Sequence, residues 1–257
     1  MHINDRSTPD TPVSAGYTPS PNPFERDILD IRYPPKKTPG TTILRHLQAT
    51  ASALTLTPHQ VAKIFPATPL ANIAANLPHI LAALTSASLD DPQMLLVALA
   101  TIRAETECFL PLAEGISPYN TSPGGHPFDL YDHRRALGNQ GPPDGADFRG
   151  RGFIQLTGRA NYTHYAAKTG HDLIADPALA CQPAIAAELL AHFLADKQIP
   201  IRHALAANDL TAARRLVNGG TNGLARFTSA FHLGTALLTD TKPVLPDEPA
   251  TRGAVTS

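Results

Sequence analysis

Apolar residues recur at helical spacing through most of the chain between residues 43 and 239, and period-two alternation is confined to short stretches. The segment that begins at Asp91 shows the pattern most clearly. Asp91 and Pro92 are typical of a helix N-cap and first helical position, and the residues from Met94 to Ile102 are apolar nearly all round. This segment is predicted to be a buried central helix.

Capping residues and prolines predict the start of further helices. Thr57, Pro58 and Gln60 form an N-cap, a first-position proline and a capping-box glutamine, so a short helix is expected to begin there. Asn76 followed by Pro78 predicts the start of another helix. The chain is therefore predicted to be mainly α-helical.

One stretch has a good strand signal, the run from Phe153 to Thr157, which lies between Gly152 and Gly158. In an extended segment Gln155 and Thr157 would point to the same side. We therefore expect a mainly α domain in which the β element is minor.

Composition divides the chain into three parts. Residues 1–42 are rich in Pro, Thr, Ser and Asp, and such a segment buries too little apolar surface to fold alone, so we expect a flexible N-terminal arm. Similar residues return in 240–257, where we expect a disordered tail. The 257 residues, 42% of them hydrophobic, are enough for one sizeable core, so one folded domain is predicted over 43–239.

The formal net charge of -1 gives no field for nucleic acid or an anionic membrane, and no apolar run approaches transmembrane length. The first residues lack the apolar region of a secretory signal, so we expect cytoplasmic synthesis without a signal peptide. The two cysteines, Cys108 and Cys181, exclude a disulfide framework but leave a single bridge open. The spacing of the histidines and aspartates between residues 126 and 133 matches no compact metal motif, so no metal or other cofactor is expected.

Two glutamates, Glu105 and Glu114, carry the candidate chemistry. Hydrolysis of a glycosidic bond needs two carboxyl groups, one to protonate the leaving oxygen and one to activate water or attack the sugar. In one continuous helix these two residues would be about 13.5 Å apart along the axis. Pro111 predicts that the helix ends near Phe109, which would let Glu114 fold back. A separation of about 6.5 to 9.5 Å would give inversion and one near 5 Å retention, a choice that the sequence leaves open. Glu107 is expected to be structural or exposed.

Three blocks carry a resemblance to a known family: AETECF, the long run YDHRRALGNQGPPDGADFRGRGFIQLTGRANY, and RRLVNGGTNGLARF. Over residues 54–238 the chain resembles glycoside hydrolase family 19, which contains chitinases and bacterial and phage lysozymes. The resemblance implies an inverting hydrolysis with Glu105 as general acid, Glu114 as general base and Thr157 positioning the attacking water. Burial is expected to raise the pKa of Glu105. The residues expected to bind substrate are Tyr131, Gln155, Asn161, Tyr162, Asn218 and Arg226.

Tyr131 is an aromatic residue that would either stack on a sugar ring or pin its loop to the core. The resemblance thus implies a lysozyme-like α+β catalytic domain over residues 43–239. The leading expectation is that it cleaves β-1,4 linkages in peptidoglycan, as a bacterial or phage lysozyme does, and acts on the cell wall after export or lysis. A chitinase is the alternative, although the absence of tryptophan argues against attack on crystalline chitin. The sequence departs from the family pattern at Ala104 and Ala225, which leaves open a non-catalytic glycan-binding or delivered toxin module. The expected partners are the polysaccharide and a delivery or immunity protein.

Overall fold

The computed structural model describes residues 56–240; the predicted arm, the helical pattern of residues 43–55 and the predicted tail beyond residue 240 lie outside this range. The described part is mainly α-helical, as predicted, with one two-stranded sheet. Its elements are α2 (Pro58–Ile64), α3 (Leu70–Ser86), α4 (Pro92–Glu105), β1 (Leu112–Ala113), α5 (Asp129–Asp132), η1 (Arg135–Leu137), α6 (Asp144–Asp147), β2 (Arg151–Gly152), α7 (Arg159–Thr169), η2 (Pro177–Cys181), α8 (Pro183–Ala206), α9 (Leu210–Asn218) and α10 (Leu224–Asp240).

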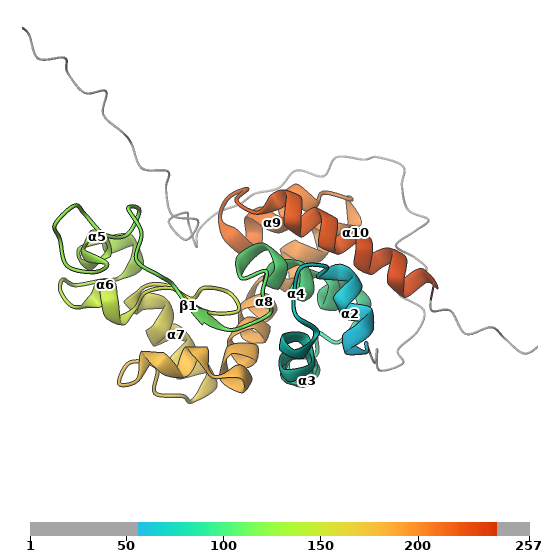
Figure 1. The fold of residues 1–257 in the computed structure, drawn as a ribbon, viewed down its shortest axis with the longest axis horizontal. Helices are drawn as coiled ribbons and strands as arrows, with labels where there is room; N and C mark the ends of the chain where they lie inside the picture. Colours follow the sequence, from blue (N-terminus) through green and yellow to red (C-terminus); the bar gives the residue numbers. More distant parts are fainter. Residues whose placement is uncertain (1–55, 241–257) are drawn as a thin grey trace, which may run out of the picture.

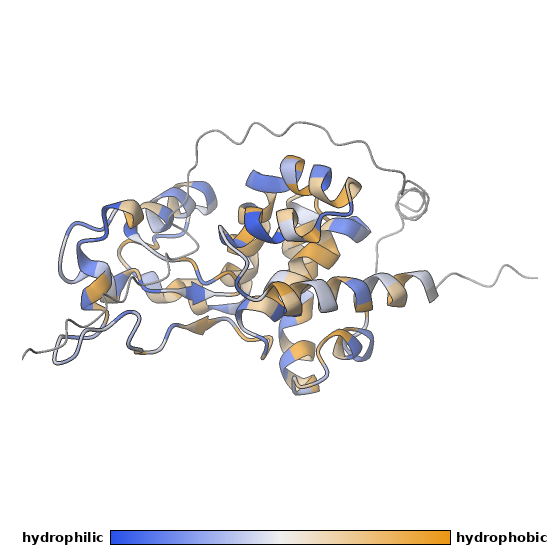
Figure 2. Ribbon diagram, turned by 90° about the horizontal axis from the view of Figure 1, so that it is seen from above, coloured by the Kyte–Doolittle hydropathy of each residue, from blue (hydrophilic) through white to orange (hydrophobic). Residues whose placement is uncertain are grey.

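The elements form two groups (Figure 1). Helices α2, α3, α4, α9 and α10 lie together, and α5, α6 and α7 lie on the other side of the sheet. The longest helix, α8, contacts α3, α4 and α9 in the first group and α7 and β2 in the second, so it joins the two. Most helices show hydrophobic and hydrophilic residues side by side, as expected for amphipathic helices that cover one core (Figure 2). Within residues 56–240 no helix is both long enough and apolar enough to cross a membrane.

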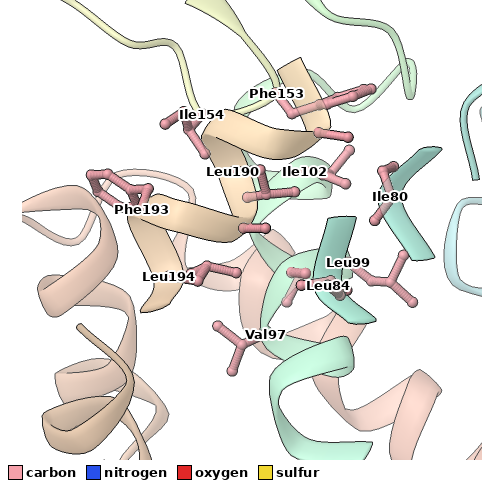
Figure 3. Packing of buried hydrophobic residues seen from close by; sticks show 14 of the residues in the cluster. Ile80, Leu84, Val97, Leu99, Ile102, Phe153, Ile154, Leu190, Phe193 and Leu194 are labelled. Atoms are coloured by element: carbon pink, nitrogen blue, oxygen red, sulfur yellow. The ribbon is translucent and has the colours of Figure 1, made fainter. Parts of the chain in front are cut away.

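Helix α4 is the centre of the core, as its apolar sequence predicts. The Asp91 side chain accepts hydrogen bonds from the backbone N–H groups of Gln93 and Met94, which fixes the start of the helix. Eleven of its 14 residues are buried, and it packs against α8 and α10. Figure 3 shows apolar side chains of α3, α4 and α8 meeting in this core, among them Ile80, Leu99 and Leu190.

Helix α3 corrects the prediction that a helix begins at Asn76 and Pro78. It begins at Leu70 and carries Pro78 in its interior. Ile73, Leu77 and Ile80 are spaced three and four residues apart and are all buried. Burial of this apolar face outweighs the hydrogen bond that the proline removes.

The end of α4 also differs from the prediction. The helix ends at Glu105, four residues before Phe109, and Thr106 is its C-cap. Glu107 and Phe109 then adopt the left-handed region, with φ angles of 41° and 59°. The Phe109 ring is fully buried and packs edge-on against Phe65 at 4.8 Å between ring centroids. The helix therefore ends at this turn, several residues ahead of Pro111, and Glu105 is its last residue.

The sheet lies next to the predicted strand and not within it. Strands β1 and β2 pair antiparallel, with Ala113 opposite Arg151. The run from Phe153 to Thr157, predicted to be extended, forms a turn closed by a bridge between Arg151 and Leu156, and Gln155 has a φ of 51°. The expectation that Gln155 and Thr157 share one side of a strand is therefore wrong. The short sheet instead places Glu114, the residue after β1, beside the residue before β2.

Candidate active site

Glu105 is held at the C-terminal end of α4 by a buried arginine. Its Oε1 lies 2.8 Å from Nη2 of Arg214, which comes from α9. The side chain of Arg214 is only 1% exposed and that of Glu105 is 16% exposed. The ion pair is therefore largely removed from water, and only the glutamate reaches solvent.

Burial raises the pKa of Glu105 above its ordinary value, although Arg214 and, more weakly, Arg226 act in the opposite direction. Removal from water disfavours the charged carboxylate, and here this effect is larger than the attraction of the two arginines. The raised pKa expected from the sequence is thus confirmed. A carboxyl group of this kind keeps its proton to higher pH than an ordinary glutamate, as a proton donor requires.

Glu114 is held by uncharged donors. Its Oε1 accepts hydrogen bonds from the Tyr131 hydroxyl at 2.9 Å and from Asn120 Nδ2 at 3.0 Å. Its Oε2 accepts one from the backbone N–H of Gly150 at 3.1 Å, and its own N–H donates to the Gly150 carbonyl at 2.7 Å. Burial and the neighbouring Glu114 raise the pKa of Tyr131, so the phenol stays protonated as a donor. Tyr131 is 8% exposed, and its ring helps to hold the loop in place.

Gly150 is the point where three side-chain oxygens converge. A Cβ atom placed there would lie 2.9 Å from Gln155 Oε1, 3.2 Å from Glu114 Oε2 and 3.3 Å from Thr157 Oγ1. The Thr157 hydroxyl donates to the Gln155 carbonyl at 2.8 Å, which leaves its oxygen lone pairs free to accept. Gln155 Nε2 donates to the carbonyl of Leu112 at 2.9 Å. The structure therefore brings Thr157 and Gln155 to the Glu114 carboxylate.

Tyr162 and Asn161 were also expected to bind substrate, and both make hydrogen bonds within the protein. Tyr162 is fully buried, and its hydroxyl donates to the Arg149 carbonyl at 2.9 Å and accepts from Arg151 at 3.0 Å. A fully buried ring offers no surface to a sugar. Tyr162 instead stabilises the loop through the hydrogen bonds of its hydroxyl with Arg149 and Arg151. Asn161 donates to the Thr157 carbonyl at 2.8 Å.

Asn218, the last residue of α9, is also buried, and its Nδ2 donates to the Asn222 carbonyl at 3.3 Å. Arg226 is half exposed and pairs with Glu107 at 3.1 Å. Glu107 thus provides Arg226 with a partner. Glu107 itself is half exposed, as expected of a residue outside the chemistry.

Two contacts were not anticipated from the sequence, those of Arg214 and Asn120. Arg214 precedes the buried residues Val217 and Asn218 by three and four positions, so it shares their face of α9. An arginine on a buried helix face requires a buried acid, and this signal was available in the sequence. Asn120 is fully buried at its loop position, and no sequence pattern marks it.

Within residues 56–240, no group of three or more His, Cys, Asp or Glu residues is arranged to hold a metal ion. Cys108 and Cys181 are both free thiols. Of the loop histidines and aspartates, His126 pairs with the buried Asp132 at 3.0 Å, and Asp129 accepts a hydrogen bond from the Ser122 backbone at 2.8 Å. His126 and Asp132 therefore pair with each other, and Asp129 pairs with Ser122.

Comparison with known proteins gives a structural likeness. No protein-family model and no curated protein sequence matches the chain. The crystal structure of chitinase C from Streptomyces griseus HUT6037 is similar, with a TM-score of 0.50 and 21% identity over 72% of this chain and 76% of that one. A mutant of chitinase C matches with a TM-score of 0.49 and 20% identity over 71% and 75% of the two chains. The chain therefore has the mainly α-helical, lysozyme-like fold that its resemblance to glycoside hydrolase family 19 predicts.

Proposed function

We propose that this chain is a glycoside hydrolase that cleaves β-1,4 linkages in a polysaccharide containing N-acetylglucosamine. The observation that carries the proposal is the environment of Glu105, a partly accessible carboxyl group whose pKa is raised by burial at the end of the central helix. Glycosidases of this type need one carboxyl group that is still protonated at the pH of reaction. The fold shared with a chitinase supports the same class of reaction.

In the proposed mechanism Glu105 donates its proton to the oxygen of the leaving sugar. Glu114 accepts a proton from a water molecule, which attacks the anomeric carbon from the opposite side and inverts its configuration. The donors Tyr131, Asn120 and the Gly150 N–H hold the Glu114 carboxylate in one orientation. Each carboxylate oxygen has two acceptor sites, so Oε2 retains one for the water.

Thr157 is proposed to orient that water. Its hydroxyl oxygen and Glu114 Oε2 would lie 3.3 Å and 3.2 Å from a Cβ atom at Gly150, and its proton is already donated to the Gln155 carbonyl. The oxygen is therefore free to accept a hydrogen bond from the water while Glu114 accepts the other proton. This division of roles makes Thr157 an orienting group and Glu114 the base.

The substrate that we propose is peptidoglycan, which makes the enzyme a lysozyme-type N-acetylmuramidase that acts on the cell wall after export, lysis or delivery. The sequence resemblance to bacterial and phage lysozymes and the absence of tryptophan support it. The alternative substrate is chitin, which the structural likeness to chitinase C favours. An accompanying delivery or immunity protein belongs to the peptidoglycan proposal.

Digestion of purified peptidoglycan and colloidal chitin side by side tests the proposal. New reducing ends from peptidoglycan are the expected result, and release from chitin alone would reject the muramidase in favour of the chitinase. The anomeric configuration of the first product, read by proton NMR before mutarotation, tests the inverting mechanism.

The Glu105→Gln variant distinguishes an enzyme from a binding module. Loss of hydrolysis with glycan binding retained supports catalysis, whereas wild-type lysis by this variant would support a non-catalytic role. Glu107→Gln is the matched control, because Glu107 is two residues away and already half exposed.

A further inference from the structure

Arg214 makes contacts with three parts of the molecule. Its Nη2 binds Glu105 at the end of α4, its Nε donates to the Asn222 carbonyl at 2.8 Å, and its guanidinium lies 6.0 Å from the centre of the Phe227 ring of α10. Its Nη1 is buried and has no hydrogen-bond partner within residues 56–240. Glu105 is thus the carboxyl group that lies against this buried cation.

The arginines nearby behave differently. Arg215, the next residue on α9, is exposed, and Arg226 is half exposed in its pair with Glu107. Exposed pairs of this kind contribute little, because water and salt screen them. The buried pair therefore marks Arg214 as the arginine that acts on Glu105 most directly.

The turn between α9 and α10 is packed closely enough to fix this geometry. A Cβ atom at Gly223 would lie 3.1 Å from the Ala104 Cβ and 3.3 Å from Arg214 Nη2. Gly223 has a φ of 71°, which favours glycine in any case. The small residue Ala104, a departure from the family pattern, allows the turn to approach α4. This close packing places the Asn222 carbonyl beside Arg214 and the Arg214 guanidinium beside Glu105.

We propose that Arg214 is a positioning residue for the general acid, which orients the Glu105 carboxyl group and ties it to the turn that follows α9. The proposal rests on the proposed function of Glu105 as proton donor. The planar fork of arginine suits the role, because Nε and Nη2 bind two partners at a fixed angle. A lysine ammonium has no such fixed geometry.

Arg214 also limits the effect of burial on the acid. The charged groups that act on Glu105 are Arg214 from α9 and Arg226 from α10, and both lower its pKa against the larger effect of burial. Of the two arginines, removal of Arg214 would leave only the more weakly acting and more exposed Arg226 to oppose the effect of burial. The pKa of Glu105 is then expected to rise further.

The test compares Arg214→Met, Arg214→Lys and the neighbouring control Arg215→Met. The Glu105 carboxyl group is titrated by carbon-13 NMR in the full chain, and its signal is identified by its loss in Glu105→Gln. Hydrolysis is measured in parallel across the same pH range. We expect Arg214→Met to raise the pKa of Glu105, to move the alkaline limb of kcat upward and to lower kcat by roughly 10- to 100-fold, with a small change in KM.

Arg214→Lys is expected to keep the pKa of Glu105 close to that of wild type, because the lysine ammonium keeps the positive charge. Its kcat is expected to stay well below that of wild type, because the ammonium lacks the planar geometry of the guanidinium. Arg215→Met should have the wild-type pKa of Glu105 and the wild-type kcat. A wild-type titration and a wild-type kcat in Arg214→Met would overturn the proposal. If that variant fails to fold, Arg214→Lys decides, and a wild-type kcat in Arg214→Lys counts against the inference. If the wild type cleaves neither glycan, the proposed function fails, while the NMR titrations still decide whether Arg214 controls Glu105.

Discussion

The two carboxyl groups of the site are held by different physical means. Glu105 ends a buried helix and faces a buried cation, Arg214, which comes from a distant part of the chain. Glu114 follows a two-residue strand and is held by Tyr131, Asn120 and a backbone N–H, all of them neutral donors. One side of the site is thus organised by burial and charge, and the other by hydrogen bonds from loops.

This contrast supports the different tasks that the proposed mechanism gives to two residues of the same type. Sequence presents Glu105 and Glu114 as equivalent side chains. Burial raises the pKa of Glu105 and favours the proton donor there. The neutral donors hold the Glu114 carboxylate in one orientation, which suits a group that accepts a proton in the proposed mechanism.

The largest effect is expected from Glu105→Gln. The amide keeps the shape of the side chain but has no acidic proton, so kcat should fall by about 10² to 10⁴-fold. Because the variant also removes the partner of the buried Arg214, thermal unfolding and glycan binding are measured alongside hydrolysis. Retained activity above a tenth of wild type would exclude Glu105 as the general acid.

The pH profile of kcat/KM sharpens the same comparison. Glu105 must be protonated, and its pKa is raised by burial, so activity should persist above the ordinary value of 4.5 and then fall about tenfold per pH unit once Glu105 ionises. A flat profile between about pH 5 and 9 is incompatible with this role.

The pH dependence of unfolding should also report the protonation of Glu105. The folded state binds it more tightly than the unfolded chain, where the ordinary value of 4.5 applies. The Glu105 contribution to stability is therefore fully present below 4.5, is lost as pH rises toward the folded-state pKa, and is constant above it. Glu105→Gln should remove this part of the pH dependence of thermal unfolding.

The Glu114 side is tested by Gly150→Ala. The added methyl group would lie 3.2 Å from Glu114 Oε2 and 3.3 Å from Thr157 Oγ1, so both oxygens must move. We expect kcat to fall about tenfold and the free energy of unfolding by about 1 kcal/mol. Gly115→Ala is the control, because a Cβ atom there meets nothing within 4 Å. Equal activity of the two variants would remove Glu114 and Thr157 from the chemistry.

A smaller effect is expected from Tyr131→Phe. The substitution removes one of three hydrogen bonds to the Glu114 carboxylate and leaves those of Asn120 and Gly150. A net loss of about 1 kcal/mol, or roughly fivefold in kcat, is expected from kinetics at fixed pH. Tyr119→Phe, in the same loop but 71% exposed, should have wild-type kinetics.

The features that the sequence predicted correctly are local. The cap at Asp91 and the capping box of Thr57 and Gln60 depend on residues within one turn, and both are present. The raised pKa of Glu105 was expected from burial in a partly apolar cleft, and burial is its largest cause.

The features that the sequence did not reveal depend on packing between distant segments. Pro78 lies inside α3 because the apolar face around it is buried. Phe153 to Thr157 forms a turn because the strand pairing with β1 uses Arg151 and Gly152 instead. The pairing of Arg214 with Glu105 joins α9 to α4, and no local pattern specifies that contact.

The smallest effect is expected from the exposed pair of Arg226 and Glu107. The two side chains are 52% and 47% exposed, so solvent screens their attraction, and the pair should contribute well below about 1 kcal/mol to stability. Arg226→Gln should shift the Glu105 titration less than Arg214→Met does, because Arg226 is the weaker of the two charges acting on that carboxyl group. Carbon-13 titration and thermal unfolding of Arg226→Gln and Glu107→Gln measure both effects. A larger shift from Arg226 than from Arg214 would mean that exposure, and not burial, decides which arginine controls the acid.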